Sequence, residues 1–163
     1  MMDNKTCSVD ILSVSLGEEG YLIIPRQTRE LCEPLVKAAD ALEKALDTMR
    51  RAVSALDEAG FGDMTLCPET MGKVGQLGTL DEVLALCGVD SRITPCIDFG
   101  HLNARTLGGI QTKADYAAIL DRMAEVLDDD RARQFHVHFS RIEYSAGGEK
   151  RHWTFADTQF GPE

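Results

Sequence analysis

The sequence alternates between stretches with helical spacing of apolar residues and short continuous apolar runs. Over residues 33–59, apolar side chains recur at three- and four-residue steps, and Gly60 follows where a helix would stop. This spacing predicts a long amphipathic helix. The next apolar run, residues 64–67, predicts a buried strand whose C-terminal end delivers a loop at residues 68–72.

The same alternation recurs further along the chain. Thr79 and Glu82 have the spacing of a capping box, which predicts that a short helix begins there. A second apolar run, residues 93–97, predicts a strand. Because residues 98–109 are polar and rich in glycine, we expect them to form a loop after that strand.

A third helix and a third strand complete the pattern. Thr112 is expected to cap a helix whose apolar positions run from Tyr116 to Leu127. Residues 134–139 predict the third strand, which opens into a long loop at residues 140–155. Strands that alternate with helices at crossover spacings of about 30–40 residues are typical of parallel βα units. The pattern therefore predicts an α/β fold.

The length of the chain limits how many such units it holds. A complete (β/α)8 barrel needs roughly 190 residues at the least and about 250 in typical cases. The chain has 163 residues, so a complete barrel does not fit. Residues 1–32 stay unassigned, although short apolar runs at residues 9–14 and 21–24 would suit two strands and a turn.

Composition and charge narrow the class of protein. With 44% hydrophobic residues, the chain suits one domain of ordinary size. No apolar stretch approaches the roughly 18 residues of a membrane helix, and the first residues do not form a secretory signal. The five cysteines form no CxxC pair, so we expect them to act as small apolar residues of the core. Their scattered positions also fit a protein of the reducing cytoplasm. The net charge of −10 disfavours general attraction to nucleic-acid phosphates.

Carboxylates and imidazoles follow the predicted strands at their C-terminal ends, where α/β folds place their ligands. All four histidines of the chain fall in this region. The candidate metal ligands are Glu69, Asp98, His101, His138 and His152. Oxygen and nitrogen donors of this kind suit Zn²⁺, Mn²⁺ or Fe²⁺ better than Ca²⁺.

Some of these residues have a purely structural interpretation as well. Asp98 would also serve as the N-cap of the segment that follows it. His136 and His138 lie two residues apart and therefore face the same side of a strand. We expect His136 to be a satisfied core histidine and His138 to reach the mouth of the site. Cys67 and Cys96 are expected to be buried at equivalent places in their strands, with no thiolate among the ligands.

A family resemblance is carried by three stretches, LCPETMGKVGQLGTLDEVLALC, ITPCIDFGHLNAR and FHVHFSRIEYSAGGEKRHWTF. They resemble the second half of the endonuclease IV group (AP endonuclease family 2) within the xylose isomerase-like TIM barrels. The resemblance covers about residues 33–163. It implies a partial (β/α)8 TIM barrel, truncated relative to a full barrel, and we expect the chain to be a fragment of a longer product.

The resemblance also implies a metal site and an activity. In such a site Glu69 would be the catalytic residue that bridges two metal ions, and Asp98 and His138 would hold one of them. Zn²⁺ is the implied cofactor, with Mn²⁺ or Mg²⁺ as alternatives. The implied reaction is hydrolysis of a phosphodiester bond beside an abasic site in DNA, a step of DNA repair. The implied phosphate-binding residues are Arg141, Lys150 and Arg151.

The resemblance breaks down at one ligand. The Asp-Arg-His motif of the family, which with His101 would hold a further metal, appears here as Lys150-Arg151-His152. A lysine removes an oxygen donor and adds positive charge. This favours fewer metals, and so an alternative function as a sugar or sugar-phosphate isomerase or epimerase with one divalent metal. A further alternative is a non-catalytic barrel fragment that self-associates through open sheet edges.

Overall fold

A computed structural model gives the fold of the chain in two units. The units are Met1–Asp40 and Ala41–Glu163, and each is considered by itself. The structure describes the backbone of residues 15–16, 22–23, 26–127 and 129–159. None of the described helices has both the length and the apolar content of a membrane span.

The first unit contains a short hairpin and the start of a helix. β1 (Ser15–Leu16) pairs antiparallel with β2 (Leu22–Ile23). β2 falls within the apolar run at residues 21–24, whereas the run at residues 9–14 lies outside the described residues. Helix α1 (Arg26–Glu58) begins earlier than the expected residue 33. Its first residues do not show the regular apolar spacing that predicts a helix. They can still extend it, because each residue added to an existing helix gains one backbone hydrogen bond.

Three extended segments form the parallel part of the second unit. β3 (Cys96–Asp98) pairs with β4 (His136–His138), which confirms the second and third predicted strands in shortened form. The segment before them forms only isolated bridges, from Leu66 to Ile93 and from Glu69 to Cys96. Pro68 lies between these bridges and has no amide hydrogen, so the ladder lacks one bond there. The first predicted strand is therefore interrupted.

Helix α2 (Leu80–Cys87) joins the first two extended segments. The Thr79 hydroxyl accepts a hydrogen bond from the Glu82 amide, and the Glu82 carboxylate accepts one from the Thr79 amide. The predicted capping box is thus confirmed. The predicted third helix is also confirmed as α4 (Lys113–Leu127), directly after Thr112.

The glycine-rich stretch after β3 is a helix, α3 (Phe99–Arg105), where a loop was expected. Its N-cap is Asp98, whose carboxylate accepts a hydrogen bond from the His101 amide. Gly100 is needed for packing rather than for a turn, since a Cβ atom there would lie 3.0 Å from the Ser140 carbonyl oxygen. The sequence alone does not distinguish a glycine that lets two segments approach closely from a glycine in a loop, which explains why a loop was expected here.

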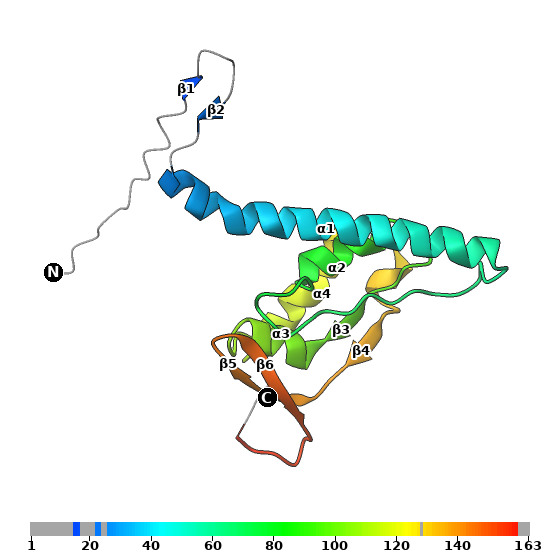
Figure 1. The fold of residues 1–163 in the computed structure, drawn as a ribbon. Helices are drawn as coiled ribbons and strands as arrows, with labels where there is room; N and C mark the ends of the chain where they lie inside the picture. Colours follow the sequence, from blue (N-terminus) through cyan, green and yellow to red (C-terminus); the bar gives the residue numbers. More distant parts are fainter. Residues whose placement is uncertain (1–14, 17–21, 24–25, 128, 160–163) are drawn as a thin grey trace. The chain divides into compact units, whose positions relative to one another are not determined.

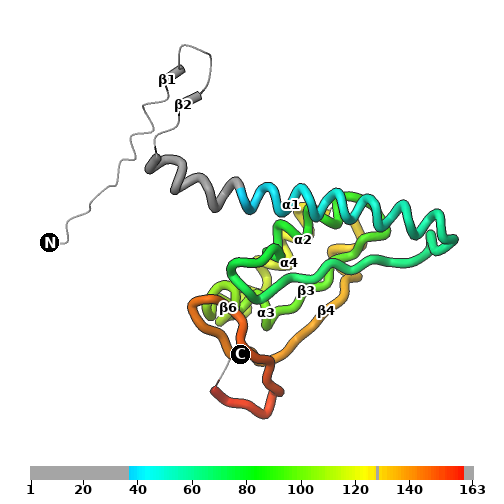
Figure 2. The backbone as a smooth tube through the Cα atoms, in the orientation of Figure 1, coloured from blue at the N-terminus to red at the C-terminus, as the bar shows by residue number. Residues whose placement is uncertain are grey.

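The segment after β4 is a hairpin, although the sequence suggested a loop. A 3-10 turn, η1 (Asp130–Ala132), precedes β4, and β5 (Arg141–Ser145) pairs antiparallel with β6 (Gly148–Trp153) after it. Both hairpin strands contact α3. In Figures 1 and 2, β3 and β4 run side by side and lead toward α3 and this hairpin.

The hydrophobic core lies between α2, β3, α3 and α4, and α1 contributes Met49 and Val53 from its C-terminal half. Its buried members are Leu84, Cys87, Ile93, Ile97, Phe99, Leu102, Ile110, Met123 and Leu127. The described residues therefore form a mixed α/β unit with a partial parallel sheet and no closed barrel. The C-terminal ends of its parallel segments meet at one edge of the sheet.

Candidate metal centre

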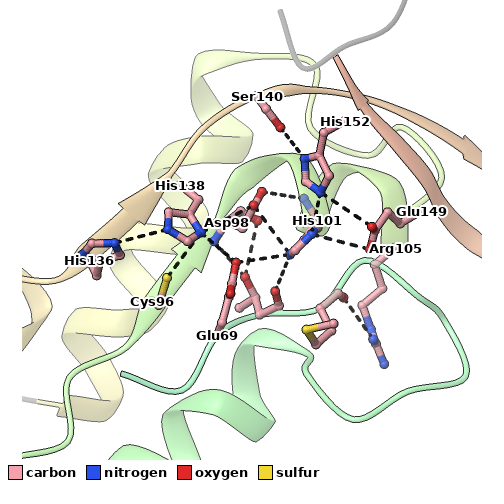
Figure 3. A network of polar contacts seen from close by, with 12 residues as sticks. Glu69, Cys96, Asp98, His101, Arg105, His136, His138, Ser140, Glu149 and His152 are labelled. Atoms are coloured by element: carbon pink, nitrogen blue, oxygen red, sulfur yellow. Dashed lines mark hydrogen bonds and ion pairs between the residues drawn. The ribbon is translucent and has the colours of Figure 1, made fainter. Parts of the chain in front are cut away.

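The predicted ligands gather at this edge around one cavity. Glu69 follows the first extended segment, Asp98 ends β3 and His138 ends β4. The cavity has a volume of about 430 Å³. Its lining residues are Glu69, Asp98, His101, Val137, His138, Phe139, Ser140 and His152. All five candidate ligands thus face one cavity, and Figure 3 shows their side chains turned toward one another.

Three of the ligands form what we term the Glu69 group: Glu69, Asp98 and His138. His138 Nδ1 lies 2.8 Å from Glu69 Oε1 and 3.9 Å from Asp98 Oδ2. One ligand atom from each residue fits within a span of 4.8 Å, which is compact enough for a single cation. The carboxylates and the imidazole suit a divalent transition metal.

Asp98 is the most deeply buried carboxylate of the site. The residue is 3% exposed, and one carboxylate oxygen accepts the His101 amide at 2.9 Å. Among the described residues, its ion-pair partners are the imidazoles of His101 and His138, and no lysine or arginine pairs with it. Because a buried carboxylate needs a compensating charge, this environment suits a bound cation.

Three ligands form the His101 group: Asp98, His101 and His152. His101 Nδ1 lies 2.7 Å from the Thr70 carbonyl oxygen, which can only accept, so the ring carries its proton on Nδ1. The lone pair of a neutral His101 is then on Nε2, 3.1 Å from His152 Nε2. His152 Nδ1 bonds to the Ser140 hydroxyl at 2.8 Å. Outer hydrogen bonds of this kind orient histidines that bind metals.

The carboxylate of Glu149 lies beside two members of the His101 group, although it is not among the ligands expected from the sequence. It lies 3.5 Å from His101 Nε2 and 3.6 Å from His152 Nε2, and its side chain is 19% exposed. An acidic residue in a glycine-rich hairpin gives no signal of this placement. Lys150, which was expected to bring its charge to this place, instead forms an ion pair with Glu143. This contact lowers the pKa of the Glu143 carboxyl.

A further set of ligands, which we term the Cys96 group, contains Cys96, His136 and His138. Cys96 is buried, as expected, and its Sγ lies 3.8 Å from His138 Nδ1, so its thiol is close enough to count as a candidate donor. His136 is exposed rather than a core histidine, and its Nε2 lies 3.2 Å from His138 Nε2. Burial, with a smaller contribution from Glu69, raises the pKa of Cys96 to about 11. Cys67 was expected to be buried and is exposed.

Two of the basic residues expected to meet phosphates contact other side chains of the hairpin. The Arg151 guanidinium lies over the Trp153 ring, 4.1 Å from its centroid. Lys150 pairs with Glu143, and Arg141 lies in β5. None of the three basic residues is among those that line the cavity.

Comparisons with known proteins agree with this architecture. Residues 12–161 match the family described as "Xylose isomerase-like TIM barrel", which confirms the expected fold class. The chain is also similar to an uncharacterized protein of Methanocaldococcus jannaschii, with 41% identity over 112 residues. The match covers 69% of this chain and 40% of that relative. No solved structure matches the chain significantly.

Proposed function

Because the chain belongs to the xylose isomerase-like TIM barrel family, we propose that it is a metal-dependent phosphodiester hydrolase of the AP endonuclease type. The family includes both endonuclease IV enzymes and sugar isomerases. One observation carries the choice between them: Asp98 belongs to the Glu69 group and to the His101 group at once. Two neighbouring cation positions with a shared carboxylate suit a two-metal phosphodiesterase.

The residues present fit two divalent cations. Glu69, Asp98 and His138 would hold the first cation, with Asp98, rather than Glu69 as the resemblance implies, as the carboxylate shared by the two cations. Asp98, His101 and His152 would hold the second, and Glu149 would supply the oxygen donor that Lys150 cannot supply. Zn²⁺ accepts mixed carboxylate and imidazole ligands, and Mn²⁺ would also fit.

The chain's own groups have separable tasks in this proposal. Polarisation of the phosphodiester and a lowered pKa of an attacking water would be the chemistry that cations held by these residues supply. The Thr70 carbonyl holds the His101 ring in the tautomer that presents Nε2. The Ser140 hydroxyl orients His152. The exposed ring of Phe139 forms an apolar wall of the cavity, against which a planar or deoxyribose surface of abasic-site DNA would lie.

A duplex with a single abasic site tests the proposal. We expect the zinc-loaded chain to nick the strand beside the site, and we expect a chelator to abolish nicking and added zinc to restore it. Glu69→Gln should reduce the rate at least about a hundredfold, since it removes a charged ligand. Asp63→Asn, at an exposed acid before the first extended segment, is the matched control. Equal nicking by the Glu69→Gln variant would overturn the proposed role of Glu69.

Isomerisation of a sugar or sugar phosphate is the second candidate. The net charge of −10 favours it, because a strongly acidic protein attracts a DNA backbone weakly. The engagement of Lys150 and Arg151 within the hairpin favours it as well. One bound metal per chain, together with aldose–ketose interconversion and no nicking of the duplex, would support this candidate over hydrolysis.

A further inference from the structure

The register of the parallel strands stacks two layers of ligands on one face of the sheet. Asp98 lies opposite His138, and Cys96 lies opposite His136. Side chains two residues apart in a strand point to the same face, so all four point the same way. Cys96 and His136 therefore form a second layer, two residues nearer the N-terminal ends of the strands than Asp98 and His138. In a closed barrel, inward-facing layers are ordinarily filled by branched apolar side chains, whereas this layer contains a thiol and an exposed imidazole.

Potential ligand atoms of three residues lie close together around this deeper layer. A tetrahedral zinc ion holds two nitrogen ligands roughly 3.3 Å apart, and a nitrogen and a sulfur roughly 3.6 Å apart. The Nε2 atoms of His136 and His138 are 3.2 Å apart, close to the first of these spacings. Cys96 Sγ lies 3.8 Å from the other nitrogen of the same ring, His138 Nδ1, so a cation bound through His138 Nε2 requires the thiol or the ring to reorient. One ligand atom from each of the three residues fits within 4.8 Å.

We propose that Cys96, His136 and His138 form a separate binding site for one borderline-soft transition-metal cation, with Zn²⁺ as the natural occupant. A thiolate and two imidazoles prefer zinc, cobalt or copper, whereas magnesium and calcium prefer oxygen ligands. This donor set differs from that of the Glu69 and His101 groups, which contain carboxylates. The proposal does not depend on the function proposed above.

The two layers compete for one residue. The ring of His138 belongs to both the Cys96 group and the Glu69 group. A neutral imidazole has one lone pair for a metal, so a neutral His138 serves one cation at a time. A cation in the Cys96 group would therefore withdraw His138 from the Glu69 group. The site would favour one cation position or the other according to the softness of the available metal.

Cobalt binding to the metal-free full-length chain tests this site directly. A cysteine thiolate bound to Co²⁺ gives a charge-transfer absorption in the near ultraviolet, and oxygen and imidazole ligands give none. We expect the wild-type chain to develop this absorption, with an intensity at saturation that corresponds to one thiolate-bound cobalt ion per chain. Cys96→Ser should lose the absorption, and His136→Gln should weaken cobalt binding at this site at least about tenfold.

Two further variants separate the possible outcomes. Cys67→Ser removes an exposed thiol from the neighbouring segment and should leave the absorption unchanged. Glu69→Gln should retain the absorption or increase it, even if it removes hydrolytic activity, so the two proposals fail independently. Because His136 is exposed, His136→Gln should fold normally even if Cys96→Ser does not. Cobalt binding without the absorption in the wild type, or with it in Cys96→Ser, would refute the site.

Discussion

The Glu149 carboxylate lies 3.5 Å from Nε2 of His101, and a bulge in β6 allows this approach. In the register of the two strands, Arg151 lies opposite Glu143 and Glu149 lies opposite the following residue, Tyr144. Lys150 therefore has no residue opposite it and is the extra residue of the bulge. The extra residue brings Glu149 and His152 to the same face of the strand, although they are three positions apart. The hairpin thus supplies a carboxylate beside the imidazoles of His101 and His152.

This arrangement predicts opposite behaviour of two neighbouring residues. Glu149→Gln should weaken zinc binding by the His101 group at least about tenfold, because the amide lacks the negative charge. Lys150→Gln should leave zinc affinity unchanged, because its ammonium group points to Glu143. Competition with a chromophoric chelator measures both affinities. A loss of affinity in Lys150→Gln that equals the loss in Glu149→Gln would contradict the assignment.

Asp98 is predicted to govern the metal content of the whole cavity edge. Asp98→Asn should lower the zinc content of the two carboxylate-containing groups together, whereas Glu69→Gln should affect only its own group. Asparagine is a good N-cap, so α3 should keep its first turn and the fold should persist. Zinc content after dialysis and the far-ultraviolet circular dichroism spectrum provide the two readouts. Normal zinc content in Asp98→Asn would show that Asp98 is a cap alone.

Arg92 makes a pH-dependent contribution to stability. Its guanidinium bonds to the carboxylates of Asp90 and Asp57, which lowers the pKa of Asp90 from 3.8 to about 2 and lowers that of Asp57 as well. A carboxyl group whose pKa is lower in the folded than in the unfolded state stabilises the fold at pH values above its unfolded-state pKa. This contribution is lost as the pH falls through the folded-state pKa.

We therefore expect Arg92→Gln to be less stable than the wild type at pH 7. The difference should shrink between about pH 4 and pH 2, as the two partner carboxylates become protonated. Urea unfolding across this pH range measures the difference. A difference that stays constant down to about pH 2 would mean that Arg92 acts through packing rather than through its charge.

Gly148 is predicted to resist substitution more than its neighbour Gly147. Gly148 has φ +88°, and a Cβ atom on it would overlap the carbonyl oxygen of Gly72. That oxygen accepts the Glu149 amide at 3.0 Å, so the clash would disturb the carboxylate beside the His101 group. Gly148→Ala should lower the free energy of unfolding by more than about 1 kcal/mol.

Gly147→Ala is the matched control for this substitution. Its Cβ atom would meet only the Ser145 hydroxyl, at 3.9 Å. We expect its stability to stay within about 0.5 kcal/mol of the wild type. Thermal unfolding of both variants, with hydrogen exchange at the Glu149 amide, distinguishes a local from a global effect. Equal stability of the two variants would show that the Gly72 segment moves freely.

Local signals in the sequence predicted much of the fold. The capping box at Thr79 and Glu82 and the helix after Thr112 rest on residues close in sequence, and both are present. Strand length is harder to predict, as Pro68 shows. Its missing amide hydrogen interrupts the ladder only because the chain pairs with a neighbouring strand at this position, and that pairing is not visible in the local sequence. Gly100 resembles a loop residue in the sequence, since its close neighbour, Ser140, lies far along the chain.

The residue types that follow each strand can be read from the sequence, so Glu69, Asp98 and His138 are predictable as candidate ligands without coordinates. Which other groups lie beside them depends on the folded chain. The bulge that turns Glu149 inward and the register that sets Cys96 beside His136 both arise from pairing between strands. Hydrophobic periodicity records the face on which a side chain lies, whereas register and bulges depend on partners that are distant in sequence.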